Sequence, residues 1–337
     1  MHYLDLADFT NEEVLNMIEL SRMLKRADKL GACPHLLEDR SLGMIFMESS
    51  TRTRISFEVA MTKLGGHALY LKPGEIHIGK SETVKDTALV LSRLVDAIEI
   101  RTTEDEDIAE LAKHATVPVI NGMGSYIHPT QALCDLMTML ENMPEGKDLS
   151  DVTLAFIGDA TEYENCGTAL SHILPRLGGN FIYASPEGYI ADEEFYAPAR
   201  KACELGGGTF TIVNDPEEAV KNADFIYSSV MWYEGYDADM EGRMKVFLPK
   251  YQLNEELAAK APAHAKYMHY LPAQRGYEMT DGIMDSEMSL LWDQAENRLY
   301  SIMAILVKLL KGTKHEASDA LKAEQKAKIE AWMVENL

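Results

Sequence analysis

Short apolar stretches alternate with segments of helical periodicity along almost the whole chain. Leu42–Met47 is an apolar run of strand length, and after it Phe57, Met61 and Leu64 recur at the helical spacing. Alternating strands and helices are typical of parallel sheets covered by helices on both faces, so the sequence predicts an α/β fold. The expected strands are Leu42–Met47, Ala68–Leu71, Ala97–Arg101, Val117–Asn121, Val152–Ile157, Asn180–Ala184, Thr209–Val213, Phe225–Val230 and Lys266–Tyr270.

A break in this pattern divides the chain into two parts. Gln131–Leu140 has one apolar helical face, and the Pro-Glu-Gly-Lys-Asp segment of residues 144–148 interrupts the periodicity after it. A long predicted helix, Asp293–Lys311, follows the second set of strands, and we expect it to pack back on the first part. We therefore expect two doubly wound parallel-sheet domains, one formed by residues 1–142 plus 299–337 and the other by residues 143–298.

A second helical stretch closes the chain at residues 316–337. It has few large apolar residues, so it forms only a weak apolar face for packing against its own subunit. It either lies loosely on its own subunit or docks on a neighbouring one through Trp332 and Met333. We favour docking, because an amphipathic helix commonly binds in an apolar groove.

Composition excludes several classes of partner. The chain has 337 residues, of which 46% are hydrophobic and 26% charged, as in a soluble globular protein with full cores. A net charge of −22 argues against nucleic acid, whose backbone needs a basic surface. No signal peptide or membrane-spanning run is evident, so we expect a cytoplasmic protein with no membrane partner. The acidic surface could attract a cationic substrate, although solubility alone explains it about as well.

The sequence gives no strong indication of a cofactor or a metal. Cys33, Cys134, Cys166 and Cys203 stand far apart and read as ordinary buried thiols. The Gly-x-Gly-x-x-Gly motif is absent, and residues 74–81 match the letters of the P-loop pattern Gly-x-x-x-x-Gly-Lys-Ser, which alone is a weak indication of a nucleotide site. We expect no cofactor and no metal.

A segment rich in hydroxyls and arginines lies between the first predicted strand and the helix after it. Ser50, Thr51, Arg52 and Thr53 occupy the first turn of that helix. Free backbone N–H groups and the positive end of the helix dipole meet there, and they favour an anion together with the hydroxyls and guanidinium. A capped helix with two solvated arginines is the alternative. We favour a phosphate site.

Other polar residues follow the carboxyl ends of predicted strands, where open α/β sheets bind their ligands. Arg101 closes one strand, and His128 and Gln131 begin a helix after another, with Pro129 suited to its first turn. A lone histidine before proline is more often a cap, but its place at the same sheet edge as Arg52 favours a functional role. The set combines phosphate donors with donors for a carbonyl oxygen, which fits acyl or carbamoyl phosphate.

A set of ordered motifs spans nearly the full length of the chain. They are Ser50-Thr-Arg-Thr-Arg54, Leu64-Gly-Gly66, Lys85-Asp-Thr87, Leu91-Ser-Arg93, His128-Pro-Thr-Gln131, Gly158-Asp159, Leu271-Pro272 and Asp293–Arg298. Through these motifs the chain resembles the aspartate and ornithine carbamoyltransferase family. Within the family it is most similar to the putrescine carbamoyltransferases, through Tyr227–Tyr236, Met244–Gln252 and the extra C-terminal helix.

The resemblance implies a carbamoyltransferase with its active site in the cleft between a carbamoyl phosphate domain and an amine domain. It also implies a homotrimer with shared sites, in which the loop Gly74–Ser81 of a neighbour contributes. In that arrangement the first turn of the helix and Arg298 hold phosphate, the Leu271 carbonyl receives the carbamoyl amide, and no covalent intermediate forms. The residues implied are Arg52, Arg101 and His128 for catalysis and Ser50, Thr51, Arg52, Thr53, His77, Arg101, His128, Gln131, Glu162, Ser229, Tyr270, Leu271 and Arg298 for substrate binding.

The chain departs from the family pattern around the second substrate. Tyr270 replaces a cysteine, Ser229 lies in a segment that lacks the aspartate of ornithine enzymes, and His77 replaces a glutamine. Glu162 stands where ornithine enzymes have an asparagine and either pairs with a distant ammonium group or belongs to a solvated acidic turn. The missing aspartate and the acidic Glu162 favour putrescine or a related amine as the acceptor, whereas Tyr270 counts against putrescine because its ring would crowd the space where a diamine should thread. Ornithine, and a homologue that binds carbamoyl phosphate without turnover, remain the alternatives.

Overall fold

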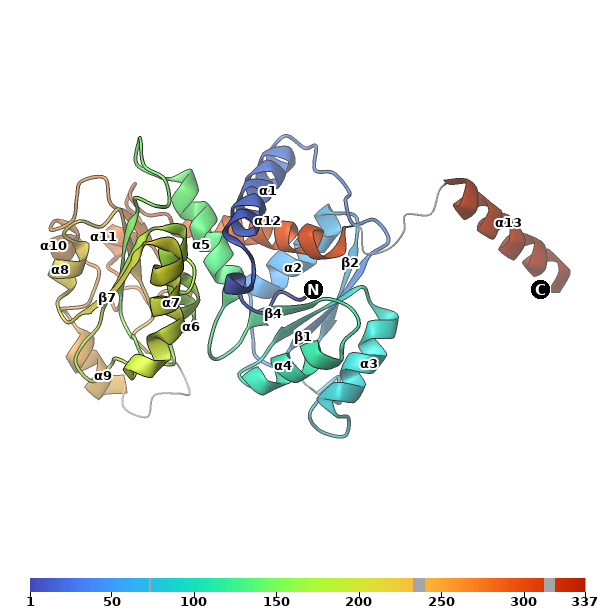
Figure 1. The fold of residues 1–337 in the computed structure, drawn as a ribbon, viewed down its shortest axis with the longest axis horizontal. Coiled ribbons are helices and arrows are strands. Elements are labelled where there is room, and N and C mark those ends of the chain that lie inside the picture. The colour runs from blue at the N-terminus through green and yellow to red at the C-terminus, as the bar shows by residue number, and fades with distance from the viewer. Residues whose placement is uncertain (73, 233–239, 312–318, 337) are drawn as a thin grey trace.

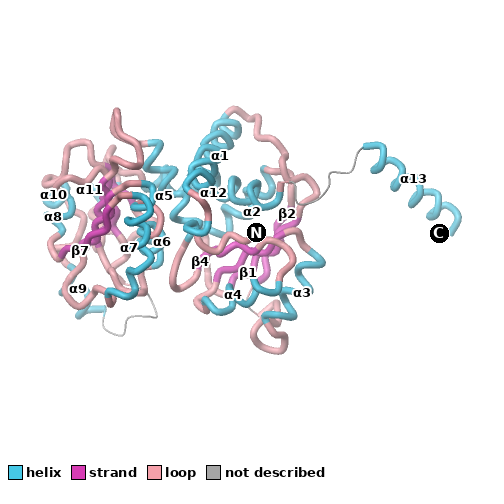
Figure 2. The backbone as a smooth tube through the Cα atoms, in the orientation of Figure 1, coloured by secondary structure: helices cyan, strands magenta, loops and turns pink. Residues whose placement is uncertain are grey.

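The computed structural model describes residues 1–337 except 73, 233–239, 312–318 and 337. Residues 233–236 of the expected acceptor segment Tyr227–Tyr236 therefore lie outside the described residues. Figures 1 and 2 show two α/β parts side by side, each built on a parallel sheet. The first sheet has the order β2 (His67–Leu71), β1 (Ser41–Phe46), β3 (Ala97–Arg101) and β4 (Val119–Met123).

The second sheet is also parallel throughout. Its order is β7 (Thr209–Val213), β6 (Asn180–Ala184), β5 (Thr153–Ile157), β8 (Phe225–Ser228) and β9 (Lys266–Met268). All nine predicted strands are present, and the predicted fold class is confirmed. β9 ends two residues earlier than expected because the backbone N–H of His269 donates to Gln294 Oε1 at 2.9 Å instead of continuing the ladder.

Helices cover both faces of the first sheet. Figure 1 shows α1, α2 and the later helix α12 (Leu291–Leu310) on one side and α3 and α4 on the other. A capping box at Thr10 and Glu13 begins the first of them. The helices of this part are α1 (Asn11–Lys29), α2 (Arg52–Lys63), α3 (Val84–Leu94), α4 (Asp105–His114) and α5 (Pro129–Glu141), after the 3₁₀ turn η1 (Leu6–Asp8).

The second part carries shorter helices around its sheet. Phe156, Phe181, Tyr183 and Tyr227 stack in a chain of aromatic contacts within its core. Its helical elements are α6 (Asn165–Ser171), η2 (Pro175–Leu177), η3 (Glu193–Tyr196), α7 (Ala197–Gly206), α8 (Pro216–Val220), α9 (Met240–Phe247), α10 (Glu255–Ala258) and α11 (Asp281–Met284).

Two buried helices join the parts. The residues of α5 from Pro129 to Met139 are all buried, and α5 contacts α1, α6 and α12. α12 runs unbroken from the second part back onto α1 and α2, where Ile302, Met303 and Leu306 enter the first core. A helix that is apolar on most of its surface is stable only when it is buried, which accounts for its central place.

The last described helix, α13 (Asp319–Asn336), stands apart from both sheets (Figure 1). Trp332 is 58% exposed and Met333 is 47% exposed. The two side chains that we expect to dock on a neighbour are therefore not covered by their own subunit. Docking itself stays a prediction.

None of the helices in the described part of the chain has both the length and the apolar character needed to cross a membrane.

Candidate active site

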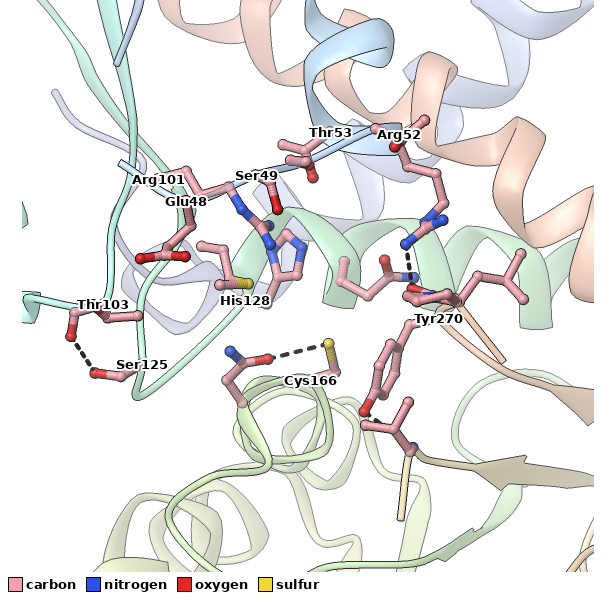
Figure 3. Close-up of a pocket in the computed structure, with 18 of the residues that line it drawn as sticks. Glu48, Ser49, Arg52, Thr53, Arg101, Thr103, Ser125, His128, Cys166 and Tyr270 are labelled. Carbon is pink, nitrogen blue, oxygen red and sulfur yellow. Dashed lines mark hydrogen bonds between the residues drawn. The ribbon is translucent and has the colours of Figure 1, made fainter. Parts of the chain in front are cut away.

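A cavity of about 600 Å³ opens where the carboxyl ends of the two sheets face each other. Its walls come from both parts of the molecule, and Figure 3 shows the first part contributing Arg52, Arg101 and His128 and the second contributing Tyr270. The residues that line it are Glu48, Ser49, Ser50, Thr51, Arg52, Thr53, Arg101, Thr103, Met123, Ser125, His128, Gln131, Tyr163, Asn165, Cys166, Val230, Trp232, Tyr270, Leu271, Pro272, Gln274 and Arg298.

The start of α2 faces this cavity. Thr51 is the N-cap residue, but its side chain makes no capping hydrogen bond. Arg52 is not solvated either, since its Nη2 donates to the carbonyl oxygen of Leu271 at 2.7 Å. The alternative of a capped helix with solvated arginines therefore does not describe Thr51 or Arg52. Helix N–H groups, hydroxyls and a guanidinium converge here, as an oxyanion requires.

Arg298 is the centre of the buried polar contacts on the same side. The guanidinium comes from α12 and is 3% exposed. Its Nη1 donates to His128 Nε2 at 3.2 Å and to Gln131 Oε1, and its Nη2 donates to Thr53 Oγ1 at 3.0 Å. One side chain from the end of the chain thus aligns three residues of the first domain.

The contacts of His128 determine its protonation. Burial, reinforced by Arg298, Arg101 and Arg52, holds the pKa of His128 well below its usual value, so the ring is neutral at physiological pH. Because Arg298 can only donate, Nε2 of His128 is the acceptor and Nδ1 carries the proton, facing Thr130 Oγ1 at 3.3 Å. In this arrangement His128 is a poor proton acceptor, because a second proton would add a charge beside three guanidiniums.

Arg101 and Arg52 complete a cationic wall inside an acidic protein. Burial lowers the pKa of Arg101 to about 10 and also lowers the pKa of Arg52, to which Arg298 contributes by repulsion. Both guanidiniums remain protonated at neutral pH. Three guanidiniums that face one cavity repel one another, so a dianion bound between them would stabilise all three.

Gln131 is held in one orientation. Its amide nitrogen Nε2 donates to Asp135 Oδ1 at 2.7 Å, and Gln294 Nε2 donates to the same oxygen at 2.7 Å. Tyr227 donates its hydroxyl to Asp135 Oδ2 at 3.1 Å. The carbonyl oxygen of Gln131 consequently faces Arg298 and the cavity, where it can accept a hydrogen bond from an amide.

The opposite wall is built around Tyr270. Its hydroxyl donates to Glu164 Oε2 at 3.1 Å and accepts from the backbone N–H of Val230 at 3.3 Å. Leu271, the next residue, has φ +58°, and this left-handed backbone is associated with a carbonyl oxygen that faces Arg52. The phenol expected near the acceptor therefore occupies a fixed place.

The structure brings most of the predicted residues together and leaves three outside. Glu162 is exposed and does not line the cavity, because the Thr161–Glu164 turn points Glu164 inward and Glu162 outward. Ser229 is buried behind the wall, next to Val230. His77 is exposed within the loop 74–81 and lies outside the lining. The predicted residues that do line the cavity are Ser50, Thr51, Arg52, Thr53, Arg101, His128, Gln131, Tyr270, Leu271 and Arg298.

Several lining residues were not predicted from the sequence. Asn165 and Cys166 begin α6, directly after the loop that follows β5. Ligands bind beyond the carboxyl ends of strands, and this rule applies to β5 as it does to β1. If the search after β5 had extended to residue 166, it would have identified Asn165 and Cys166. Tyr163, Val230 and Trp232 give no comparable signal, since aromatic and aliphatic residues are usually core.

The described residues include no group of three or more His, Cys, Asp or Glu side chains placed to hold a metal ion.

Comparison with known proteins gives a consistent result. Residues 1–141 match the family described as aspartate/ornithine carbamoyltransferase, carbamoyl-P binding domain, and residues 150–309 match its Asp/Orn binding domain. The chain is 43% identical to a putrescine carbamoyltransferase of Mycoplasma capricolum over 98% of its length and 92% of the relative. It is 44% identical to an ornithine carbamoyltransferase of Pyrococcus abyssi over 92% of its length and 95% of the relative.

Solved structures agree with this. The ornithine carbamoyltransferase from Pyrococcus furiosus superposes with a TM-score of 0.86 at 43% identity, covering 93% of this chain and 98% of that one. The related sequences thus share a carbamoyl group as the transferred unit and differ in the named acceptor.

Proposed function

This chain belongs to the aspartate/ornithine carbamoyltransferase family, and from that premise we propose that it transfers the carbamoyl group of carbamoyl phosphate to putrescine or a related amine. Carbamoyl transfer is common to its named relatives, and the protein is a transferase. The acceptor is the part that the proposal adds.

The observation that carries the proposal is the cationic wall around Arg298. Arg52, Arg101 and Arg298 face one cavity together with the hydroxyls of Ser50 and Thr53. Guanidinium forks and hydroxyls match the oxygens of a phosphate, and they are worth more where water is excluded. We assign the phosphate of carbamoyl phosphate to the start of α2 and to Arg298.

The carbamoyl group would then lie between Arg101 and Gln131. Arg101 stabilises the negative charge that develops on the carbonyl oxygen, while Gln131 Oε1 and the Leu271 carbonyl accept the amide N–H groups. His128 is neutral, and its Nε2 accepts a hydrogen bond from Arg298, so in this tautomer it orients Arg298 and does not donate to the carbonyl oxygen. A neutral amine attacks the carbonyl carbon and phosphate leaves, so the enzyme supplies position and charge stabilisation without a covalent intermediate.

The Arg52–Leu271 contact joins the two walls of the cavity, so carbamoyl phosphate that binds Arg52 also changes the contacts of Leu271. Arg52 Nη2 donates to the carbonyl oxygen of Leu271 at 2.7 Å. A phosphate draws that guanidinium away, because a charged pair is stronger than a hydrogen bond to a neutral carbonyl. The Leu271 carbonyl is then available to the carbamoyl amide, which favours binding of carbamoyl phosphate before the amine.

The opposite wall, which is built around Tyr270, favours an acceptor without a carboxylate. Its described lining residues carry no charged side chain that could pair with the carboxylate of an amino acid. Ser229 lies in a segment that lacks the aspartate with which ornithine enzymes contact the amino acid end of their substrate. The lining residues of this wall are Tyr163, Asn165, Cys166, Val230, Trp232, Tyr270, Leu271, Pro272 and Gln274.

A panel of acceptors tests the proposal. Purified protein is assayed for phosphate release from carbamoyl phosphate with putrescine, longer and shorter diamines, ornithine and aspartate. We expect the highest kcat/KM with putrescine or another diamine. Arg52→Ala should reduce turnover by about 100-fold or more, because it removes a charged group at the reacting phosphate.

The outcomes separate the alternatives. A preference for ornithine would replace the proposed acceptor while leaving carbamoyl transfer intact. Binding of carbamoyl phosphate in a calorimeter without turnover of any acceptor would instead identify a non-catalytic homologue. Turnover that is unchanged in Arg52→Ala would contradict the assignment of the phosphate site.

A further inference from the structure

Carbamoyl transfer to an alkylamine requires that a proton be removed from the acceptor. The acceptor arrives as R–NH₃⁺, whereas only R–NH₂ has the electron pair that forms the new N–C bond. The C–O bond to phosphate then breaks, and the departing phosphate takes the second amine proton as HPO₄²⁻. One proton per turnover is left over. The need to remove this proton rests on the proposed function, with an alkylamine as the acceptor.

The cationic wall is unsuited to take that first proton. His128 is the imidazole of the cavity, and its pKa is held well below the usual value by burial and by Arg298, Arg101 and Arg52. Protonating it would place a fourth positive charge among three guanidiniums. The proton acceptor is therefore expected on the opposite wall, where the amine enters.

On the opposite wall, Tyr270 connects the cavity to a buried carboxyl. The phenol lines the cavity, and its hydroxyl donates to Glu164 Oε2 at 3.1 Å. Figure 3 shows the ring of Tyr270 beside Cys166, across the cavity from His128. Glu164 is fully buried, and its other oxygen, Oε1, accepts from the N–H groups of Cys166 and Gly167 at 3.1 Å each. The carboxyl therefore has a fixed orientation, with Oε2 directed at the phenol.

We propose that Tyr270 and Glu164 form the relay that deprotonates the acceptor ammonium. The ammonium N–H gives its proton to the Tyr270 oxygen as the Tyr270 O–H gives its proton to Glu164 Oε2. The products of this step are R–NH₂, an unchanged phenol and a neutral Glu164 carboxyl, and the carboxyl returns its proton to solvent between turnovers. Tyr270 is the catalytic residue of the relay, and Glu164 acts through it.

The surroundings of Glu164 suit a group that gains and loses a proton near neutrality. Burial raises its pKa to about 7, partly offset by hydrogen bonds from Gly167 and Ser229. Asp159 raises the pKa further by repulsion, although the buried Arg243 pairs with Asp159 and limits that effect. The remaining titratable groups that face it are Cys166 on α6, Tyr183 on β6 and Tyr270 itself.

Two other carboxyls near the cavity fit the role less well. The pKa of Asp135 is also raised to about 7 by burial, but Asp135 reaches the cavity through the amide of Gln131, which does not pass a proton. Glu48 is exposed and lies beside Arg101 on the cationic wall (Figure 3). Asp135 does accept from the hydroxyl of Tyr227, but Tyr227 does not line the cavity.

Comparing two nucleophiles tests the relay. Putrescine is mostly ammonium at neutral pH, whereas hydroxylamine is mostly neutral and needs no base. Tyr270→Phe and Glu164→Gln should each lower kcat/KM for putrescine by about 100-fold at neutral pH. The loss should shrink as pH rises and free amine becomes abundant. The loss of kcat/KM in these variants should be at least about tenfold smaller with hydroxylamine than with putrescine.

Controls separate chemistry from folding. Tyr251→Phe removes a hydroxyl of the same domain that donates to the carbonyl oxygen of Asn214, outside the cavity lining, and should leave both rates near wild type. The affinity for inorganic phosphate, measured by calorimetry, should be unchanged in all three variants. Phosphate is expected to bind to the cationic wall and therefore reports whether that wall is correctly folded. If one relay variant fails this check, the other decides the outcome.

The results are decisive in each direction. A larger loss with putrescine than with hydroxylamine supports the relay. Equal losses with both nucleophiles, or wild-type rates, overturn it while carbamoyl transfer by the wild type still stands. If putrescine is not a substrate, the same comparison is made with ornithine. Absence of wild-type turnover with every acceptor would overturn the proposed function, and the relay with it.

Discussion

Arg298 lies where the contacts of three predicted site residues converge, on a helix more than 160 residues away along the chain. Its fork fixes the tautomer of His128 and the direction of the Gln131 amide. Behind Gln131, Asp135 is fully buried and takes hydrogen bonds from Gln131, Gln294 and Tyr227. The site is thus oriented by a buried acid that does not itself line the cavity.

That acid makes stability depend on pH. Burial raises the pKa of Asp135 to about 7, whereas the unfolded chain has the ordinary value of 3.8. Between these values the native protein holds a proton that the unfolded protein has released, so the contribution of Asp135 to stability falls as pH rises through this window. In urea denaturation, the stability of wild type relative to Asp135→Asn should therefore decrease from about pH 4 to about pH 7 and then level off.

A control residue shows the opposite dependence. Hydrogen bonds from Ser150 hold the pKa of the exposed Asp148 below its usual value. Stability of wild type relative to Asp148→Asn should accordingly change only below about pH 4. A flat difference for Asp135→Asn across the neutral window would contradict a proton bound at Asp135.

At the residue scale, position along the chain predicted the cationic wall better than the acceptor wall. Ser50–Thr53, Arg101 and His128 directly follow strands, so their direction is determined by the sheet. The loop after β5 is longer, and whether Glu162 or Asn165 enters the cavity depends on the turn that buries Glu164. The spacing of apolar residues along the sequence gives no information about such turn hydrogen bonds.

At the scale of elements, the strands were predictable because each is a short apolar run closed by turn residues. The boundaries of β3, β6 and β7 coincide with the prediction. The path of α12 was also predictable from its continuous apolar surface. The place of α13 was not, because few of its residues are large and apolar and its own subunit leaves them exposed.

Removing α13 tests whether it strengthens an oligomer. An isolated 18-residue helix is only marginally stable in water, so one that persists needs a surface to pack on. We expect deletion of residues 313–337 to lower the melting temperature or weaken assembly, measured by calorimetry and by light scattering. Each kcal/mol lost should lower Tm by roughly 2–4 °C.

A milder variant serves as the comparison. Trp332→Ala with Met333→Ala keeps the helix and removes the two side chains expected to dock. It should reproduce most of the effect of the deletion if docking is through these residues. Identical mass and melting temperature in all three proteins would argue against any role for α13 in assembly.

At the scale of the whole molecule, the expected trimer shares its active sites. The loop 74–81 carries His77 exposed and outside the cavity of its own subunit, as a residue offered to a neighbour would be. We therefore expect Arg52→Ala and His77→Ala to damage a shared active site from different subunits. Arg52→Ala acts in the subunit that forms the cavity, and His77→Ala acts in the neighbour that supplies the loop. Co-expressed in one cell, the two variants should show turnover well above either variant alone.

The mixed enzyme gains activity because some sites then combine an intact Arg52 with an intact His77. Co-expression of Arg52→Ala with Arg298→Ala is the control, since both residues line the cavity from the same subunit and no mixed site is restored to the same extent. Wild-type activity of His77→Ala alone, or equal activity of both mixtures, would contradict sharing through this loop.

The return of α12 to the first domain also affects how the protein is made. α1, α2 and α5 are synthesised early, but the helix that covers them ends at Leu310, about 170 residues after α5. At ribosomal rates of 5–20 residues per second, the apolar face of α5 waits roughly ten to thirty seconds for its partner, and those of α1 and α2 wait longer. The nascent first domain is therefore a candidate client for chaperones, and a gene truncated at the domain boundary encodes a product with an uncovered core.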